Sequence, residues 1–125
     1  MEENDITYKV RNCIFAVYNN LGPGLLESVY EAALCYELRK INLKVQSQVM
    51  LPVVYDDMRL DIGFRMDIVV EDMVVIEVKS VEELSKLHFK QLLTYLKISE
   101  KKVGILVNFN CDNLKENIKR VVNNL

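Results

Sequence analysis

The most regular pattern of apolar and polar positions lies in the middle of the chain, from Phe64 to Lys79. Two short runs rich in Val and Ile flank Glu71 and Asp72, which is typical of a β-hairpin. A three-residue loop over 71–73 makes one face of this hairpin entirely apolar. A two-residue loop would mix polar and apolar residues on both faces, so the pattern favours the longer loop. The apolar face then pairs Val70 with Val74, Ile68 with Ile76, and Met66 with Val78.

The opposite face of the same hairpin is charged, because this register pairs Asp67 with Glu77 and Arg65 with Lys79. Opposed carboxylates about 5 Å apart repel by roughly 3 kcal/mol at an effective dielectric near 20. A divalent cation would offset this repulsion, since two carboxylates and a backbone carbonyl are hard oxygen ligands that suit Mg²⁺ or Mn²⁺. Lys79 follows on the same face and could help deprotonate an attacking water. The alternative is a solvated face on which Arg65 and Lys79 neutralise the acids.

Apolar residues recur at helical spacing on both sides of the break at 21–24, which predicts helices over about 6–20 and 25–40. Glu27 and Tyr30 are three residues apart and therefore share one side of the second helix, near its first turn. The helix dipole and solvent would by themselves explain a glutamate there. A functional role for Glu27 needs support from the rest of the chain.

An extended stretch over 45–55 precedes the hairpin, and Pro52 within it indicates an edge strand, an interruption or a bulge. After the hairpin, Ser80-Val81-Glu82-Glu83 has the spacing of a capping box and predicts a helix over 80–98. A strand over 102–108 follows, and the strand–helix–strand succession implies parallel pairing through a right-handed crossover. A closing helix is predicted over 113–122. This order of elements predicts a mixed-sheet α/β sandwich.

Gln91 interrupts the face of the predicted helix 80–98 that should pack on the sheet. A buried amide needs hydrogen-bond partners, so Gln91 either bonds to nearby backbone or reaches over the carboxylate pair. His88 is the only histidine, and no residue at ligand spacing accompanies it. We therefore expect His88 at a boundary position rather than in a metal site.

Composition narrows the class of protein. The chain has 125 residues, half of them hydrophobic, as expected for one globular domain over 1–125. Its net charge of −2 excludes nucleic-acid binding by bulk electrostatics, so such a partner would need a local basic patch. No secretion signal or membrane-length apolar run is present, and a cytoplasmic protein is expected. The three cysteines are scattered, and we interpret them as buried or half-buried apolar residues: Cys13, Cys35 and Cys111.

The segment Gly24-Leu25-Leu26-Glu27-Ser28-Val29-Tyr30 resembles the signature that names the GxxExxY protein family, a branch of the PD-(D/E)xK nuclease superfamily. The similarity runs from about residue 6 to Leu125. It departs from the family at Tyr18, where a histidine is common, and at Met66, where a small residue is usual. Six further fragments share it: Leu21-Gly22-Pro23-Gly24, Arg65-Met66-Asp67, Glu77-Val78-Lys79, Gln91-Leu92-Leu93-Thr94-Tyr95-Leu96, Asn108-Phe109-Asn110 and Val121-Val122-Asn123-Asn124-Leu125.

The resemblance implies a restriction-endonuclease-like α-β-β-β-α-β core, a mixed sheet with helices on both faces, and extra N-terminal and C-terminal helices. It implies hydrolysis of phosphodiester bonds by metal-activated water, with Mg²⁺ or Mn²⁺ as cofactor. The implied metal ligands are Asp67, Glu77, Glu27 and the Val78 carbonyl. Lys79 would act on the attacking water or on the phosphate charge, which makes the implied catalytic set Asp67, Glu77, Lys79 and Glu27. Substrate contacts are assigned to Gln91, Tyr30 and Tyr95.

Three functional hypotheses follow. The first is a nuclease acting on DNA in preference to RNA. One domain of this size has limited surface to wrap a duplex, so a homodimer is compatible with this hypothesis. The second is a catalytically silent nucleic-acid-binding or protein-interaction module on the same fold. The third treats the charges as a salt-bridged sheet face. The third predicts that Asp67→Asn destabilises the fold, whereas a metal site without its metal should gain stability from that substitution.

Overall fold

The computed structural model describes residues 1–125, except for the side chains of Asp61 and Ile62. Three α-helices, one short 3-10 helix and five strands follow one another along the chain. In order they are α1 (Glu3–Leu21), α2 (Glu27–Lys40), β1 (Val45–Tyr55), β2 (Met58–Val70), β3 (Val74–Lys79), α3 (Lys86–Ser99), β4 (Val103–Asn108), η1 (Leu114–Asn117) and β5 (Ile118–Val122). None of the described helices is both long and apolar enough to cross a membrane.

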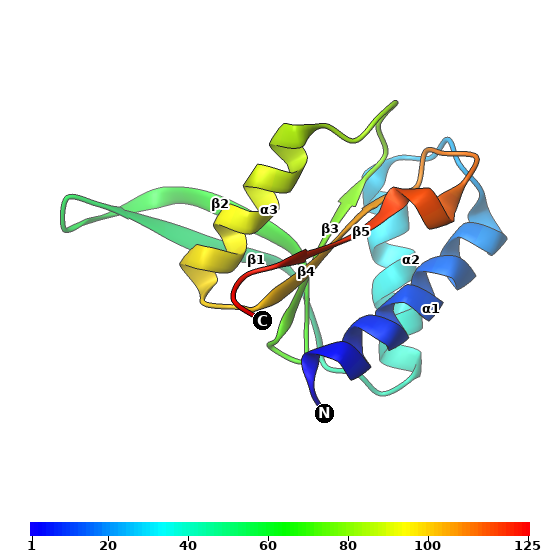
Figure 1. Cartoon of the computed structure of the whole chain (residues 1–125), viewed down its shortest axis with the longest axis horizontal. Helices are drawn as coiled ribbons and strands as arrows, with labels where there is room; N and C mark the ends of the chain where they lie inside the picture. Colours follow the sequence, from blue (N-terminus) through cyan, green and yellow to red (C-terminus); the bar gives the residue numbers. More distant parts are fainter.

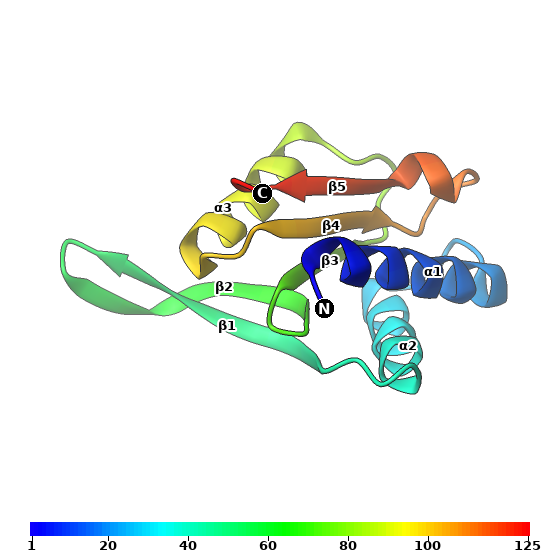
Figure 2. The same ribbon diagram turned by 60° about the horizontal axis from the view of Figure 1, so that its bottom comes forward.

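The strands form one mixed sheet in the order β1-β2-β3-β4-β5. Strands β3 and β4 are parallel, as the crossover through α3 predicted, and the other neighbours are antiparallel. Helices α1 and α2 lie on one face of the sheet and α3 lies on the other (Figure 1). Figure 2 shows that the far half of the β1–β2 ribbon extends away from this three-layered body. The prediction of a mixed sheet with helices on both faces is confirmed.

The predicted turn and register of the central hairpin are confirmed up to residue 68. Residues 71–73 form the turn, closed by a 3.0 Å bond from the Met73 N–H to the Val70 carbonyl. The β2–β3 pairs join Val70 with Val74, Val69 with Val75 and Ile68 with Ile76. Among the described pairs the β2–β3 ladder ends at Ile68 and Ile76, so Asp67 and Glu77 lie one residue beyond its last pair.

Met66 is on the opposite face from the one predicted. It packs with Val69 and Val75 beneath α3, whereas Ile68 packs beneath α1 and α2. The side-chain alternation therefore inverts between residues 66 and 68. The cause lies in β1, where Gln48 has a left-handed backbone with φ of 52°. Because β1 and β2 stay paired on both sides of Gln48, the turn in one strand changes the face of both.

Helix α3 begins six residues later than the capping-box prediction. Ser80 does not cap a helix, because its hydroxyl donates to the Leu25 carbonyl (2.6 Å) and its N–H donates to Glu27. The N-cap is Ser85, and His88 at the third helical position accepts the Ser85 N–H on Nδ1 (3.0 Å). His88 is thus a capping residue in the first turn of α3, a role that the sequence did not predict, and it is half-buried.

The predicted closing helix over 113–122 is wrong. Only Leu114–Asn117 is helical, and Ile118–Val122 is β5, paired antiparallel with β4. Ile118 packs on the α1–α2 side and Val121 packs on the α3 side, as alternating strand positions do. Strand β4 is fully buried, so its outer backbone groups need a hydrogen-bonding partner, which β5 supplies.

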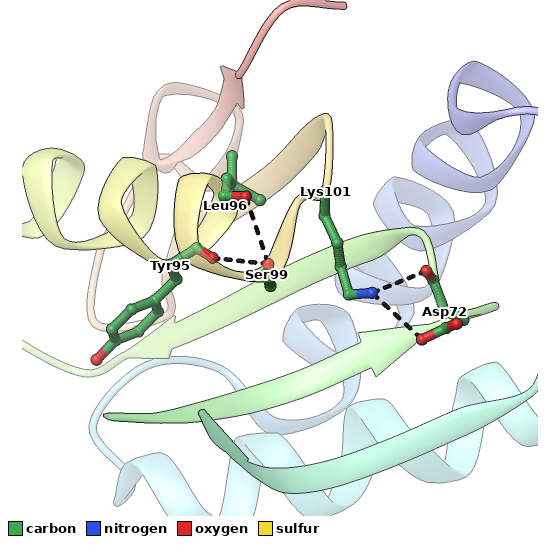
Figure 3. A network of polar contacts seen from close by, with 5 residues as sticks. All are labelled: Asp72, Tyr95, Leu96, Ser99 and Lys101. Carbon is green, nitrogen blue, oxygen red and sulfur yellow. Dashed lines mark hydrogen bonds and ion pairs between the residues drawn. The ribbon is translucent and has the colours of Figure 1, made fainter. Parts of the chain in front are cut away.

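The Lys101 side chain, just after α3, holds the end of this helix against the hairpin turn through Asp72 (Figure 3). The Lys101 ammonium donates to the Asp72 carbonyl (3.0 Å) and to its carboxylate (3.2 Å). Within the last turn of α3, the Ser99 hydroxyl donates to the Tyr95 carbonyl (2.6 Å). These contacts help fix where α3, and therefore Tyr95, lies over the sheet.

Cys13 and Cys35 are buried and Cys111 is half-buried, as predicted.

Candidate active site

Asp67 and Glu77 meet where β2 and β3 separate. The Asp67 N–H donates to the Glu77 carboxylate (2.9 Å), and the Val78 N–H donates to the Asp67 carboxylate (2.8 Å). Each carboxylate therefore accepts a hydrogen bond from a backbone N–H that would be bonded to a carbonyl in a regular ladder. The two acids are held side by side by the backbone of the neighbouring strand. Their predicted proximity is borne out by this geometry, with side chains rather than a regular ladder making the link.

Glu77 lies in a site that disfavours its ionised form. Its side chain is only 3% exposed. Burial, followed by the nearby charge of Asp67, raises the pKa of Glu77 to about 8. The Asp67 N–H and the Lys79 charge act in the opposite direction without cancelling these effects. The pKa of Asp67 is also raised, chiefly by burial, although the Val78 N–H and Lys79 lower it.

Helix α2 presents further carboxylates to the same region. The Glu27 carboxylate accepts the Ser80 N–H (3.3 Å), directly after β3. Glu31 accepts a 2.7 Å bond from the Gln48 amide, which also lies 3.5 Å from Asp67. The Gln48 amide therefore bridges Glu31 and Asp67.

Glu31 was missed by the sequence analysis. Burial, then the charges of Asp67 and Glu27, raise the pKa of Glu31, although the bond from Gln48 lowers it. The signal that could have identified Glu31 is its spacing of four residues from Glu27, which was already a candidate site residue. Residues four apart lie on one face of a helix. Gln48 offered no comparable signal, since its position depends on the left-handed turn in β1.

Lys79 is half-buried at the end of β3 and influences both acids electrostatically. It takes part in none of the ion pairs found among the described side chains. Its ammonium therefore lies near the carboxylates without being fixed to either by a close contact.

Tyr95 reaches the site from α3, and Figure 3 shows its ring extending from the helix toward the strands. Only 4% of the residue is exposed. Burial, followed by the charges of Glu77 and Asp67, raises the pKa of Tyr95 to about 12. The phenol thus stays protonated and can act only as a hydrogen-bond donor toward negative charge.

Tyr30 is not presented to a substrate. It is fully buried and stacks on Phe109, with ring centroids 4.4 Å apart. Its hydroxyl donates to the Gly22 carbonyl (2.6 Å) and accepts the Leu25 N–H (3.1 Å). Tyr30 therefore organises the loop before α2, and through that loop it positions Glu27.

Asn108 is a second residue that the sequence analysis did not assign. It is nearly fully buried at the end of β4, beside Lys79 of β3. Its amide bonds to both the N–H (3.0 Å) and the carbonyl (2.9 Å) of Val81. Asn108 thereby fixes the chain just after Lys79, and its place in a conspicuous Asn-Phe-Asn fragment was the available signal.

Gln91 is half-buried and does not contact the carboxylates through a hydrogen bond in the part of the chain whose side chains are described. It lines a pocket of about 310 Å³ between α3 and β2 instead. The pocket is bordered by Phe64, Leu87, His88, Lys90, Gln91 and Thr94.

The oxygen groups at the point where β2 and β3 separate are chemically suited to a hard divalent cation. Asp67 and Glu77 bring two carboxylates together, and Glu27 and Glu31 add negative charge beside them. The raised pKa values of Asp67, Glu77 and Glu31 reflect burial first and the charge of neighbouring acids second, and a bound cation would favour the ionised form of all three. Across the side chains that the structure describes, no three His, Cys, Asp or Glu residues converge into a ready-made cage. Among these side chains, the acids that meet directly are Asp67 and Glu77.

Comparison with known proteins gives one match. A family model described as "PD-(D/E)XK nuclease superfamily" matches residues 4–121. No curated protein and no solved structure matches the chain.

Proposed function

The chain belongs to the PD-(D/E)XK nuclease superfamily, and from that membership we propose that it is a metal-dependent nuclease. Its reaction would be hydrolysis of phosphodiester bonds in DNA, or alternatively in RNA, with Mg²⁺ or Mn²⁺ as cofactor. We further assign it to the GxxExxY branch, on the segment from Gly24 to Tyr30. The observation that carries the proposal is the pairing of two desolvated carboxylates, Asp67 and Glu77, with Lys79 beside them.

Each residue of this group has a role that its surroundings favour. Asp67, Glu77 and the Val78 carbonyl would hold the cation, and Glu27 would add charge from α2. A bound divalent cation would lower the pKa of water and neutralise negative charge on the phosphate. The Lys79 ammonium is free of close ion pairs among the described residues, so it is available to a phosphate oxygen. Tyr95 can donate a hydrogen bond toward the same charge.

The positions of these groups depend on contacts made by other residues. Backbone N–H groups fix the two strand acids, and the Ser80 N–H fixes Glu27. Preorganised charges of this kind need little rearrangement when the phosphate arrives. We therefore expect loss of activity from changes in the acids or Lys79, without loss of the fold.

The test combines metal binding with cleavage. Mn²⁺ is titrated by calorimetry into wild type and Asp67→Ala, and both proteins are incubated with labelled single-stranded DNA, duplex DNA and RNA in Mg²⁺ or Mn²⁺. The proposal expects Mn²⁺ heat and cleavage in wild type, with both lost in Asp67→Ala. Lys79→Ala should bind Mn²⁺ but cleave about 100-fold to 1000-fold more slowly, as loss of one group that stabilises transition-state charge gives. Glu83→Gln is the matched control, because Glu83 is exposed on the loop before α3.

Two outcomes would overturn the proposal. The first is an equal and negligible Mn²⁺ heat in wild type and Asp67→Ala. The second is nucleic-acid binding without cleavage under any metal, unchanged in Glu77→Ala and Lys79→Ala. That second result would favour a catalytically silent binding module on the same fold.

A further inference from the structure

The pocket between α3 and β2 has the composition of a binding site rather than of a packing gap. Phe64 of β2 supplies an aromatic ring, and Gln91, Thr94, His88 and Lys90 of α3 supply polar groups. Leu87 borders it as a highly exposed apolar residue. The volume of about 310 Å³ lies at the small end of the range for small-molecule sites. It is large enough for one planar heteroaromatic group.

The polar groups of this pocket retain free hydrogen-bonding capacity. His88 uses Nδ1 to accept the Ser85 N–H, which leaves Nε2 for another partner. Thr94 donates its hydroxyl proton to the Lys90 carbonyl, so its oxygen can still accept a bond. Lys90 is exposed and is absent from the ion pairs among the described residues. Gln91 offers an amide that can both donate and accept, as the edge of a nucleobase requires.

The Tyr95 ring lies between the pocket and the two strand acids, Asp67 and Glu77. The Phe64 ring, which borders the pocket, lies 5.1 Å from the Tyr95 ring between centroids. Tyr95 in turn lies within the electrostatic reach of Glu77 and Asp67. Gln91 is one helical turn before Tyr95 and so shares its side of α3. On β2, Phe64 precedes Asp67 by three residues, or about 10 Å of extended strand.

We propose that this pocket holds a single unpaired nucleobase of the substrate strand, stacked on Phe64 and contacted by the Gln91 amide, next to the scissile phosphate. The inference rests on the proposed function and gives it a substrate class. A base that stacks on Phe64 and bonds through its edge to Gln91 cannot at the same time stay stacked and paired in a duplex, so the preferred substrate is a single strand or a nucleotide that has left its duplex. Lys90 and the His88 Nε2–H supply the positive and donor groups for an adjoining phosphate.

Binding of a strand without its bases separates this proposal from simple phosphate attraction. The probes are a short fluorescent oligothymidylate and a strand of equal length in which every base is replaced by an abasic site. Binding is measured by anisotropy in Ca²⁺ and again in EDTA. Wild type is expected to bind the base-bearing strand about five- to a hundredfold more tightly, as stacking of one base on an aromatic ring gives.

Two variants locate the effect. Phe64→Leu keeps an apolar side chain but removes the aromatic face. The ratio of the affinities for the base-bearing and the abasic strand should therefore fall close to one. Phe89→Leu is the matched control, because Phe89 packs in the same cluster beneath α3 without bordering the pocket. It should retain the wild-type preference, and circular dichroism and thermal melting check that both variants are folded. Gln91→Ala should reduce the preference without a change in melting temperature.

The proposal is overturned if wild type binds the two strands equally, or if Phe64→Leu and Phe89→Leu keep the same preference. These failures are distinct from failure of the nuclease proposal, because the binding measurement needs no cleavage. A protein that prefers base-bearing strands through Phe64 but never cuts them would retain the pocket and lose only the reaction. A protein that cuts duplex and single strands alike, with no change in Phe64→Leu, would retain the reaction and lose the pocket.

Discussion

Replacement of Glu77 by Gln should stabilise the protein at neutral and alkaline pH. An unfolded glutamate has a pKa of 4.5, whereas burial and the charge of Asp67 raise that of folded Glu77 to about 8. The folded state thus binds this proton more tightly than the unfolded state does. The stability contributed by Glu77 is therefore fully present below pH 4.5 and is lost as the pH rises toward 8.

The size of this effect follows from the pKa difference. Each pH unit between 4.5 and 8 costs about 1.4 kcal/mol, so at pH 7 ionisation of Glu77 opposes folding by about 3 kcal/mol. A glutamine cannot ionise, and its carbonyl can still accept the Asp67 N–H. We expect Glu77→Gln to raise the free energy of unfolding by up to about 3 kcal/mol at pH 7, and by almost nothing near pH 4.5.

Urea unfolding of wild type and Glu77→Gln in EDTA, at pH 4.5, 7 and 8.5, measures this difference directly. Glu83→Gln serves as the control, because its exposed side chain should change stability little at any of these pH values. A Glu77→Gln protein that is less stable than wild type at pH 8.5 would refute the reasoning. So would a gain of equal size at pH 4.5 and 8.5, since the cost would then not arise from ionisation.

Three further predictions concern the framework of the site. Tyr30→Phe should cost about 1 kcal/mol in urea unfolding, because the Gly22 carbonyl and the Leu25 N–H lose the hydroxyl that they share. Asn108→Ala should cost at least as much and should increase amide exchange at Val81, which loses both of its bonds to the Asn108 side chain; unchanged exchange would contradict this. Gly63→Ala should disrupt the β1–β2 ribbon, since a Cβ there would overlap the Leu51 carbonyl, and faster exchange confined to that ribbon is the expected readout.

The sequence by itself determined the elements whose side-chain period is unambiguous. The alternation from Ile68 to Ile76 permits one register only, because a slip by one residue would move polar groups into the core. That register was enough to bring Asp67 and Glu77 together. An edge position or irregular pairing at Pro52 was also predictable, since proline has no N–H for the ladder; β1 is an edge strand, and the β1–β2 register shifts between Leu51 and Val53.

Other features were decided by contacts between distant segments. The apolar spacing of Ile118, Val121 and Val122 suits a helix as well as a strand, and the buried edge of β4 selected the strand. Ser80 could cap a helix, but the Leu25 carbonyl and Glu27, more than fifty residues earlier, engage it first. Such competition depends on which groups the packed layers bring within hydrogen-bonding distance.

The candidate site divides in the same way. Its strand acids and Lys79 were readable because they lie on one short hairpin, where period and pairing fix which side chains face each other. Glu31, Gln48 and Asn108 became part of the site only through packing of α2 against the sheet, the left-handed turn in β1 and the pairing of β3 with β4. A sequence encodes local periods directly, whereas which remote polar group meets a buried carboxylate depends on the full three-dimensional arrangement of the layers.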